Sequence, residues 1–460
     1  PALNEAITRE RDRAVLQTAL ESYTAILRDM EEDAKMHGRP RFSLAGPQLE
    51  AAMKALRDCA LEGLRQRNAL VMKGQSEDAD GEVQQEVEEG FDVENEVLTG
   101  VVDSVGYLIK TYKSEILPVL ESSQMLTLQT NLLDNKEPLH VNVRCGALCF
   151  LVDVAEHCGA SARVLAGTLL PHLLELAPHP SPLMRQVSVY GLGILIKLHL
   201  ESLNAPADMA AVVRALVTAA FDAGDRLDED MVCATTNAVS ALIYLIDNAA
   251  SHPGVKSAGV DGAQVLKAIV DFLPASGDQI EARLVHGWFF RQVAAGTPGI
   301  VASDGSNIAA LLSKTVDIVQ AHFQEFFGLL AVAVESEELY AQLDDGFLLE
   351  DEHLSSSIPQ LLPALQGKFG DAVVQQALSS LTPAQQGAIA NPASVAELLR
   401  PHLISQGMQA MAQAIVDNSL KFSSSLAGSG RLTLIASGLA SQAAAAAATG
   451  SGAASPGAAR

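Results

Sequence analysis

Aromatic residues are scarce in this chain. They make up only 4% of its 460 residues, and Trp288 is the single tryptophan. Sheet-forming sequences use aromatic and β-branched residues in alternating runs, and such runs are rare here. The apolar 48% is mostly Ala, Leu and Val, which suit the packing of helix on helix. The composition therefore argues against a β-rich fold and favours an all-α one.

Cysteine is also scarce. An odd and scattered set of thiols does not form a disulfide framework, so we expect a reducing compartment. Three cysteines lie near His157, but no paired C-x-x-C motif gathers four zinc ligands. We therefore predict thiols that pack as small apolar groups, and no metal site. The cysteines are Cys59, Cys145, Cys149, Cys158 and Cys233.

Positively charged residues are few. The chain has 31 Lys and Arg against 55 Asp and Glu, which gives a net charge of -24. Such a surface repels phosphate backbones and attracts basic proteins, so we predict no direct nucleic-acid partner. The alternative is that the acidity serves solubility alone. No signal peptide and no apolar run of membrane-spanning length is visible, so we predict no membrane partner. Since residues 2–14 already read as helix after Pro1, we expect that the natural N-terminus is missing.

Catalytic motifs are lacking too. Residues 190–197 do not have the glycine spacing of a phosphate-binding loop, and no G-x-S-x-G elbow is present. Residues 222–230 lack the pattern of a calcium loop, and the eleven histidines are dispersed. We predict no catalytic residue, no cofactor and no enzymatic activity. A hydrolase with an unrecognised site stays open as an alternative.

Helical periodicity is what the chain has in abundance. Leu16, Leu20, Tyr23 and Leu27 recur at spacings of three and four residues. Later helices come in pairs with short polar joints, and pairs with a period of about forty residues indicate an α-solenoid. We therefore predict an all-α superhelix of HEAT-type repeats, an armadillo-type fold. The predicted pairs are 141–157 with 161–177, 182–200 with 206–222, 228–249 with 261–273, and 280–296 with 306–319.

Composition divides the chain into five predicted regions. A run of like charges does not pack into a core, so the acidic region is expected to be a mobile loop. The Ser/Gly/Ala tail is expected to be partly disordered. The regions are HEAT-like helices at 1–74, an acidic loop at 75–94, HEAT repeats at 95–320, irregular C-terminal helical repeats at 321–420, and the low-complexity tail at 421–460.

Two arginines occupy equivalent places in predicted inner helices. Arg185 opens the helix that follows the leucine-rich residues 169–176, and Arg144 opens the one before it. Such arginines can bond to backbone or acidic groups of neighbouring repeats and so form a ladder along the stack. Trp288 starts an aromatic cluster that we interpret as core, with a groove for partner peptides as the alternative.

The order of several sequence blocks resembles the importin-β (karyopherin-β) family, closest to its importin-five (importin beta-3) branch. The blocks are NEVLTGVVDSVGYLIKTYKSEILPVLE at 95–121, VRCGALCFLVDVAEHCG at 143–159, LLPHLLELAPHPSPLMRQVSVYGLGIL at 169–195, DEDMVCATTNAVSALIYLI at 228–246 and LTPAQQGAIA at 381–390. The likeness runs from about residue 12 to residue 390. Family members are roughly twice this length, so the chain corresponds to their C-terminal half.

The resemblance implies a nuclear transport receptor that shuttles between cytoplasm and nucleus. Such receptors hold cargo on a concave acidic face, contact Phe-Gly nucleoporins on the convex face, and release import cargo to Ran-GTP. It also implies basic cargo, such as ribosomal proteins or histones, and a monomeric receptor. The repeats that hold the main Ran contact would be absent here. The rival hypothesis is another HEAT scaffold, a phosphatase regulatory or condensin-like subunit without a transport role.

The resemblance also places candidate binding residues. Asn237 matches an inner-helix position of a family repeat and joins Arg144 and Arg185 as a predicted ladder residue. The acidic region lies where the importin-five branch also has an acidic loop, and we expect it to contact cargo or Ran. Its alternative interpretation is a solvated linker. The predicted contact residues are Asp78, Asp80, Glu82, Glu86, Glu88 and Glu89.

Overall fold

The structure is a computed structural model that consists of helices. It describes residues 12–36, 44–76, 80–136, 141–221, 230–319 and 352–390, together with four isolated residues outside these ranges. Within this described part no strand occurs, and the single β-type contact is an isolated bridge between Pro298 and Val301. The chain divides into two compact units, Pro1–Val260 and Asp261–Arg460. The predicted all-α fold is confirmed.

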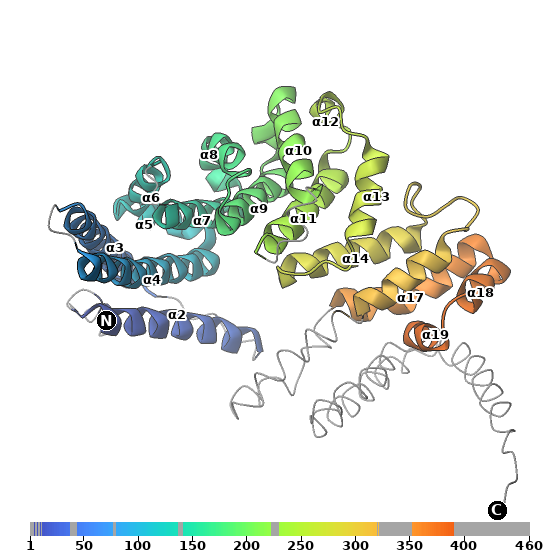
Figure 1. The fold of residues 1–460 in the computed structure, drawn as a ribbon, viewed down its shortest axis with the longest axis horizontal. Coiled ribbons are helices and arrows are strands. Elements are labelled where there is room, and N and C mark those ends of the chain that lie inside the picture. The colour runs from blue at the N-terminus through green and yellow to red at the C-terminus, as the bar shows by residue number, and fades with distance from the viewer. Residues whose placement is uncertain are drawn as a thin grey trace, which may run out of the picture. The chain divides into compact units, whose positions relative to one another are not determined.

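The first unit is a stack of helices in two layers, seen in Figure 1 as α6, α8 and α10 on one side of α7, α9 and α11. We call layer B the row in which each helix packs on the next: α2 (Arg13–Met36), α4 (Gly81–Tyr112), α7 (Val141–His157), α9 (Pro182–Leu198) and α11 (Val232–Ala249). Layer A backs it with α3 (Gly46–Gly74), α5 (Leu117–Ser122), α6 (Met125–Leu133), α8 (Arg163–Leu176) and α10 (Pro206–Phe221).

Short 3₁₀ turns join the layers, and the closest packing differs from the predicted pairing. The turns are η1 (Lys113–Ile116), η3 (Gly159–Ala162) and η4 (Leu200–Leu203), and the short α12 (Pro253–Ser257) packs on α10. The sequence predicts α7 paired with α8 and α9 with α10. The structure packs α8 more extensively on α9 and α10 more extensively on α11. Each repeat is therefore a layer A helix followed by a layer B helix.

Glycines allow the layers to approach closely. A Cβ atom at position 191 of α9 would lie 2.6 Å from Leu173 Cδ2 in α8 and 3.0 Å from Val152 Cγ2 in α7. At position 193 it would lie 3.0 Å from Ala241 Cβ in α11. The residues between and around these glycines, from 191 to 196, are all buried. Small residues in α9 therefore let the neighbouring helices pack closely, and this contact forms part of the core of the stack.

The expected acidic loop at 75–94 is wrong from Gly81 onward, because these residues form the first turns of α4. The Asp80 side chain accepts hydrogen bonds from the backbone N–H groups of Glu82 and Val83 and caps the helix. Val87 is buried, so the apolar period continues through the acidic run. The like charges point away from this apolar side, and a helix with such a side packs despite them.

The second unit has α13 (Gly262–Phe272), α14 (Gln279–Ala295), a helix at residues 308–319, and α17 (Glu352–Phe369), α18 (Asp371–Ser379) and α19 (Pro383–Ala390). Asp261 and Asp278 cap α13 and α14 through their side chains. Trp288, Phe289 and Phe290 are at most 1% exposed, so the aromatic cluster is core and the alternative of a peptide groove is wrong.

The structure describes the predicted C-terminal regions only in part, and it divides the predicted repeat region. The division between Val260 and Asp261 falls inside the predicted repeat region at 95–320. The tail at 421–460 and most of the irregular region at 321–420 lie outside the described residues. Among the helices that the structure describes, none combines the length and the apolar character needed to cross a membrane.

Candidate partner-binding surface

One side of α4 carries a row of acidic side chains. Glu89, Asp92, Glu96, Thr99 and Asp103 follow one another at steps of three and four residues, so they share one helical face. All of them are exposed. Because α2, α3 and α7 cover the remaining sides of α4, this face is the one that layer B leaves to solvent.

The next helix of layer B, α7, extends the row with two half-buried carboxylates. Burial raises the pKa of Asp153 to about 6, while nearby Lys110 lowers it, and Glu156 and Asp103 raise it. Gly106 of α4 lies opposite, and a Cβ there would stand 2.9 Å from Asp153 Oδ2. The glycine lets α4 approach the carboxylate, which brings the acidic groups of the two helices together.

We call this surface the acidic face and define it by six residues. They are Glu89, Asp92, Glu96 and Asp103 of α4 with Asp153 and Glu156 of α7. Opposite charges on an incoming chain are attracted to such a row at long range and pair more strongly with its half-buried members, where water screens less.

Tyrosines and lysines follow the acidic face along layer B. Tyr190 of α9 donates a hydrogen bond of 2.7 Å to Glu156 Oε2. The Lys197 ammonium lies 4.7 Å from the ring centroid of Tyr244 in α11 and donates to its hydroxyl at 3.1 Å. Lys110 lies 5.8 Å from the ring of the tyrosine three residues before it. The surface is therefore mainly acidic at α4 and α7, although Lys110 belongs to α4, and it carries lysine and tyrosine at α9 and α11. It is not the continuous acidic surface that basic cargo alone would predict.

A pocket opens beside the acidic face, between α3, α4, α6 and α7. Its empty volume is about 440 Å³, open mouth included. Leu98 and Val102 of α4 and Leu132 of α6 supply apolar walls, while Thr99 belongs to both the pocket and the exposed row. The pocket gives the surface a concave apolar feature next to its charges.

The predicted contact residues have separate roles in the structure. Asp80 caps α4, and Glu86 forms an ion pair of 2.5 Å with Lys73 of α3. Glu82 and Glu88 are exposed on α4, and only Glu89 begins the acidic face. Asp78 lies outside the described residues.

Sequence reasoning missed most of the acidic face. Asp92, Glu96 and Asp103 were not among the predicted contact residues, because the charged side of this helix was not followed beyond Glu89. They could have been found in the sequence, because acidic residues recur at steps of three and four residues from Glu89 onward. Asp153 and Glu156 belong to a second helix and come near this row only through tertiary packing.

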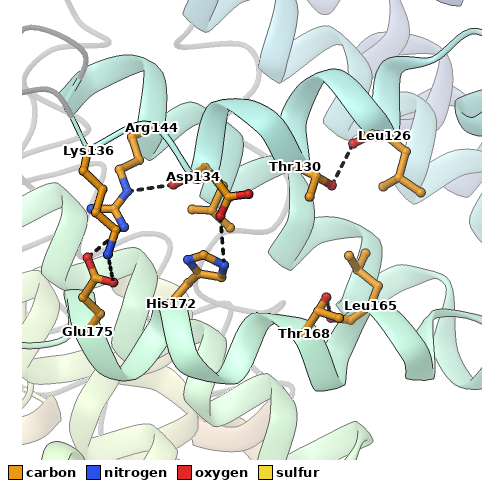
Figure 2. A network of polar contacts seen from close by, with 10 residues as sticks. Leu126, Thr130, Asp134, Lys136, Arg144, Leu165, Thr168, His172 and Glu175 are labelled. Carbon is orange, nitrogen blue, oxygen red and sulfur yellow. Dashed lines mark hydrogen bonds and ion pairs between the residues drawn. The ribbon is translucent and has the colours of Figure 1, made fainter.

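Arg144 connects two neighbouring repeats, as Figure 2 shows. Its Nε donates a hydrogen bond of 2.9 Å to the Leu133 carbonyl at the end of α6, and its Nη2 lies 3.0 Å from Glu175 Oε1 in α8. Lys136 reaches the other oxygen of Glu175 at 2.6 Å, and these partners hold the pKa of Glu175 below its usual range, the Lys136 bond most of all. Arg144 therefore links the end of α6 to α8 of the next repeat, and a ladder along the whole stack stays a prediction.

The other two ladder residues show only part of their predicted role. Arg185 Nε donates to the carbonyl of His179 at 3.2 Å, within the turn that joins α8 to α9. Asn237 is buried in α11, and its backbone carbonyl accepts from Ser240 Oγ at 3.0 Å. For these residues a link between repeats stays a prediction.

None of the five cysteines forms a disulfide. Cys59, Cys145 and Cys158 are buried, as expected for small apolar groups, whereas Cys149 and Cys233 are half-buried. Burial raises the pKa of Cys59 and of Cys158 to about 11. At pH 7.5 less than about one thiol in a thousand is then the reactive thiolate.

We expect that iodoacetamide at pH 7.5 leaves Cys59 and Cys158 unmodified in the folded protein and alkylates both in guanidinium chloride. Peptide mass spectrometry measures the extent at each site. Equal alkylation with and without denaturant would contradict the buried environment of these thiols.

Known proteins share the fold but little sequence. No family model matches the chain. The crystal structure of the karyopherin Kap121p bound to the SUMO protease Ulp1p is similar to it with a TM-score of 0.53 and 16% identity, over 82% of this chain and 30% of that chain. A structure of importin beta in an ammonium sulfate condition gives a TM-score of 0.41 and 14% identity, over 91% of this chain and 46% of that one. The chain thus spans less than a third of the karyopherin Kap121p, and it shares with that protein the HEAT-repeat solenoid fold.

Proposed function

We propose that this chain is a transport-receptor-like HEAT scaffold that binds a basic protein on the acidic face of α4 and α7. The observation that carries the proposal is the row of Glu89, Asp92, Glu96 and Asp103, which is exposed along one face of a layer B helix. A net charge of -24 attracts a Lys- and Arg-rich partner before contact, and the row gives that partner a defined place.

The mode of binding follows from the stack. Each repeat of a solenoid contacts its neighbours only, so small shifts between repeats add up and let the surface adapt to a partner. Lysines or arginines of the partner would pair with the exposed carboxylates of Asp92, Glu96 and Asp103. The proposed activity is therefore reversible binding rather than catalysis.

The wider role is part of the same proposal. The likeness of the sequence blocks supports a nuclear import receptor related to the importin-five branch, with ribosomal protein or histone-like cargo, and this chain as its C-terminal half. Ran-GTP would release the cargo, Phe-Gly nucleoporins would carry the monomeric receptor through the pore, and the protein would shuttle between cytoplasm and nucleus.

Charge reversal on α4 tests the binding surface. We expect that the double variant Glu96→Lys/Asp103→Lys binds a fluorescent Lys- and Arg-rich peptide about tenfold more weakly than the unmodified protein, a loss of about 1.4 kcal/mol. The loss should shrink as NaCl rises from about 0.05 M to about 0.3 M, because salt screens exposed charges. Fluorescence anisotropy gives both affinities.

The matched control is Glu50→Lys/Glu121→Lys, which makes the same charge change at exposed positions of α3 and α5 in layer A. It should change the affinity less than about twofold. Equal losses in both double variants would show that only net charge matters and would contradict a binding site on α4.

A transport role is separated from a different HEAT scaffold by its other partners. Immobilised Ran-GTP and Phe-Gly repeats are mixed with this chain and with the full-length receptor of which the proposal makes it the C-terminal half. Retention of the full-length protein by both supports transport. Retention by neither, with basic-peptide binding intact, leaves the scaffold and removes the transport role.

A further inference from the structure

Three potential metal ligands converge on the last turns of α7. Asp153, Glu156 and His157 lie at positions i, i+3 and i+4, so their side chains leave the same side of the helix. One ligand atom from each lies within 4.8 Å of the other two. His157 Nε2 and Glu156 Oε2 are 3.8 Å apart, which is too far for a hydrogen bond and close to the separation of two atoms on one cation.

The residues around Glu156 and Asp153 favour a role in metal binding. Glu156 accepts the hydrogen bond of Tyr190, which orients its carboxylate from α9. The half-buried Asp153 carboxylate has no hydrogen bond or ion pair with any residue that the structure describes, although Lys110 acts on it at longer range. A carboxylate that is largely withdrawn from water without a donor gains from a cation. A larger residue at position 106 would crowd this carboxylate, because a Cβ there would lie 2.9 Å from Asp153 Oδ2.

We propose that Asp153, Glu156 and His157 bind a divalent transition-metal ion of the zinc type. One imidazole nitrogen and two carboxylates form a ligand set suited to Zn²⁺, whereas Ca²⁺ and Mg²⁺ favour oxygen ligands alone. Zinc ligands lie about 2.0–2.2 Å from the metal, so the side chains need to close on the ion by small torsional changes. Three protein ligands leave a fourth position for water or for a group from a partner.

The cysteines of α7 do not belong to this site. Cys158 Sγ donates to the carbonyl of Lys113 at 3.3 Å, and Cys145 lies two turns before the site on the same helix. Cys149 stands one turn before Asp153, where a thiolate could compete for zinc. A Cys149→Ser variant therefore separates the proposed carboxylate–imidazole site from a thiolate site.

The test uses the whole chain, stripped of metal with EDTA and titrated with Zn²⁺ by isothermal calorimetry and against a chromophoric chelator. We expect one saturable site, kept in Cys149→Ser and weakened at least tenfold in His157→Ala and in Asp153→Asn. The matched control His172→Ala removes a half-buried histidine whose Nε2 lies 3.5 Å from Asp134 Oδ1, away from the proposed ligands, and should keep the site. Mg²⁺ and Ca²⁺ at equal concentration should not displace Zn²⁺.

A second measurement shows the ligands directly. Co²⁺ added to the metal-free protein should give visible absorption bands of four-coordinate nitrogen and oxygen ligation, without a thiolate charge-transfer band, and His157→Ala should lose them. Circular dichroism confirms that each variant is folded. Absence of a saturable site, a His157→Ala affinity equal to that of the unmodified protein, or a thiolate band lost with Cys149→Ser would each overturn the proposal.

Discussion

Replacing Gly191 by valine is expected to lower the free energy of unfolding by about 2–3 kcal/mol, because the added atoms overpack a close helix contact. A Cβ at this position already stands 2.6 Å from Leu173 and 3.0 Å from Val152, atoms of two different helices. Valine adds two stiff methyl groups at the same place. The measurement is guanidinium chloride unfolding followed by circular dichroism, on both proteins under the same conditions.

The matched control is Gly167→Ala on α8. A Cβ there meets nothing within 4 Å, so only the helix preference of alanine acts. We expect a gain of about 0.5–1 kcal/mol. If Gly191→Val were as harmless as Gly167→Ala, the close packing of α9 on α7 and α8 would be refuted.

Replacing Arg144 by methionine is expected to cost about 2–3 kcal/mol, because it leaves the buried end of α6 without a donor. Arg144 is 8% exposed, and it serves both the Leu133 carbonyl and Glu175. Methionine keeps much of the side-chain volume and removes the guanidinium. Glu175 keeps Lys136 and water, so the loss arises mainly at the carbonyl and at the link between α7 and α8.

Arg163→Met is the control for charge and length. The Arg163 side chain is 61% exposed and pairs with Glu201 at 2.6 Å on the surface. Such pairs contribute little, so the expected change is within about 0.5 kcal/mol. Similar losses in the two variants would mean that Arg144 does not join repeats more strongly than a surface arginine does.

The helical stack could be predicted from sequence because its signal is local. Leu16, Leu20 and Tyr23 are buried in α2 as their spacing indicates, and α8 falls within the helix predicted at 161–177. Which helix packs on which is decided by contacts between residues far apart in the sequence. The sequence predicted that α8 pairs with α7, but α8 packs more extensively on α9. Side-chain period gives the face of a helix but not the neighbour that covers it.

The candidate site was harder to predict for the same reason. The charges at Glu86 and Glu89 were interpreted as a loop because a like-charged run was weighed without the apolar period of Val87 and Val97 beneath it. Asp103 and Asp153 come together only when α4 packs on α7. A sequence shows which residues are charged, whereas the common face of two helices depends on tertiary packing.

Site-specific photo-crosslinking can show whether a basic partner binds to the acidic face of α4 and α7. A photoreactive phenylalanine analogue replaces Thr99, in the middle of the acidic row, or Val164, which is 83% exposed on α8 in layer A. After irradiation with a labelled Lys- and Arg-rich peptide, we expect a crosslink from position 99 that excess unlabelled peptide removes, and none from position 164. Equal yields at both positions, or a crosslink from position 164 alone, would contradict binding at this face.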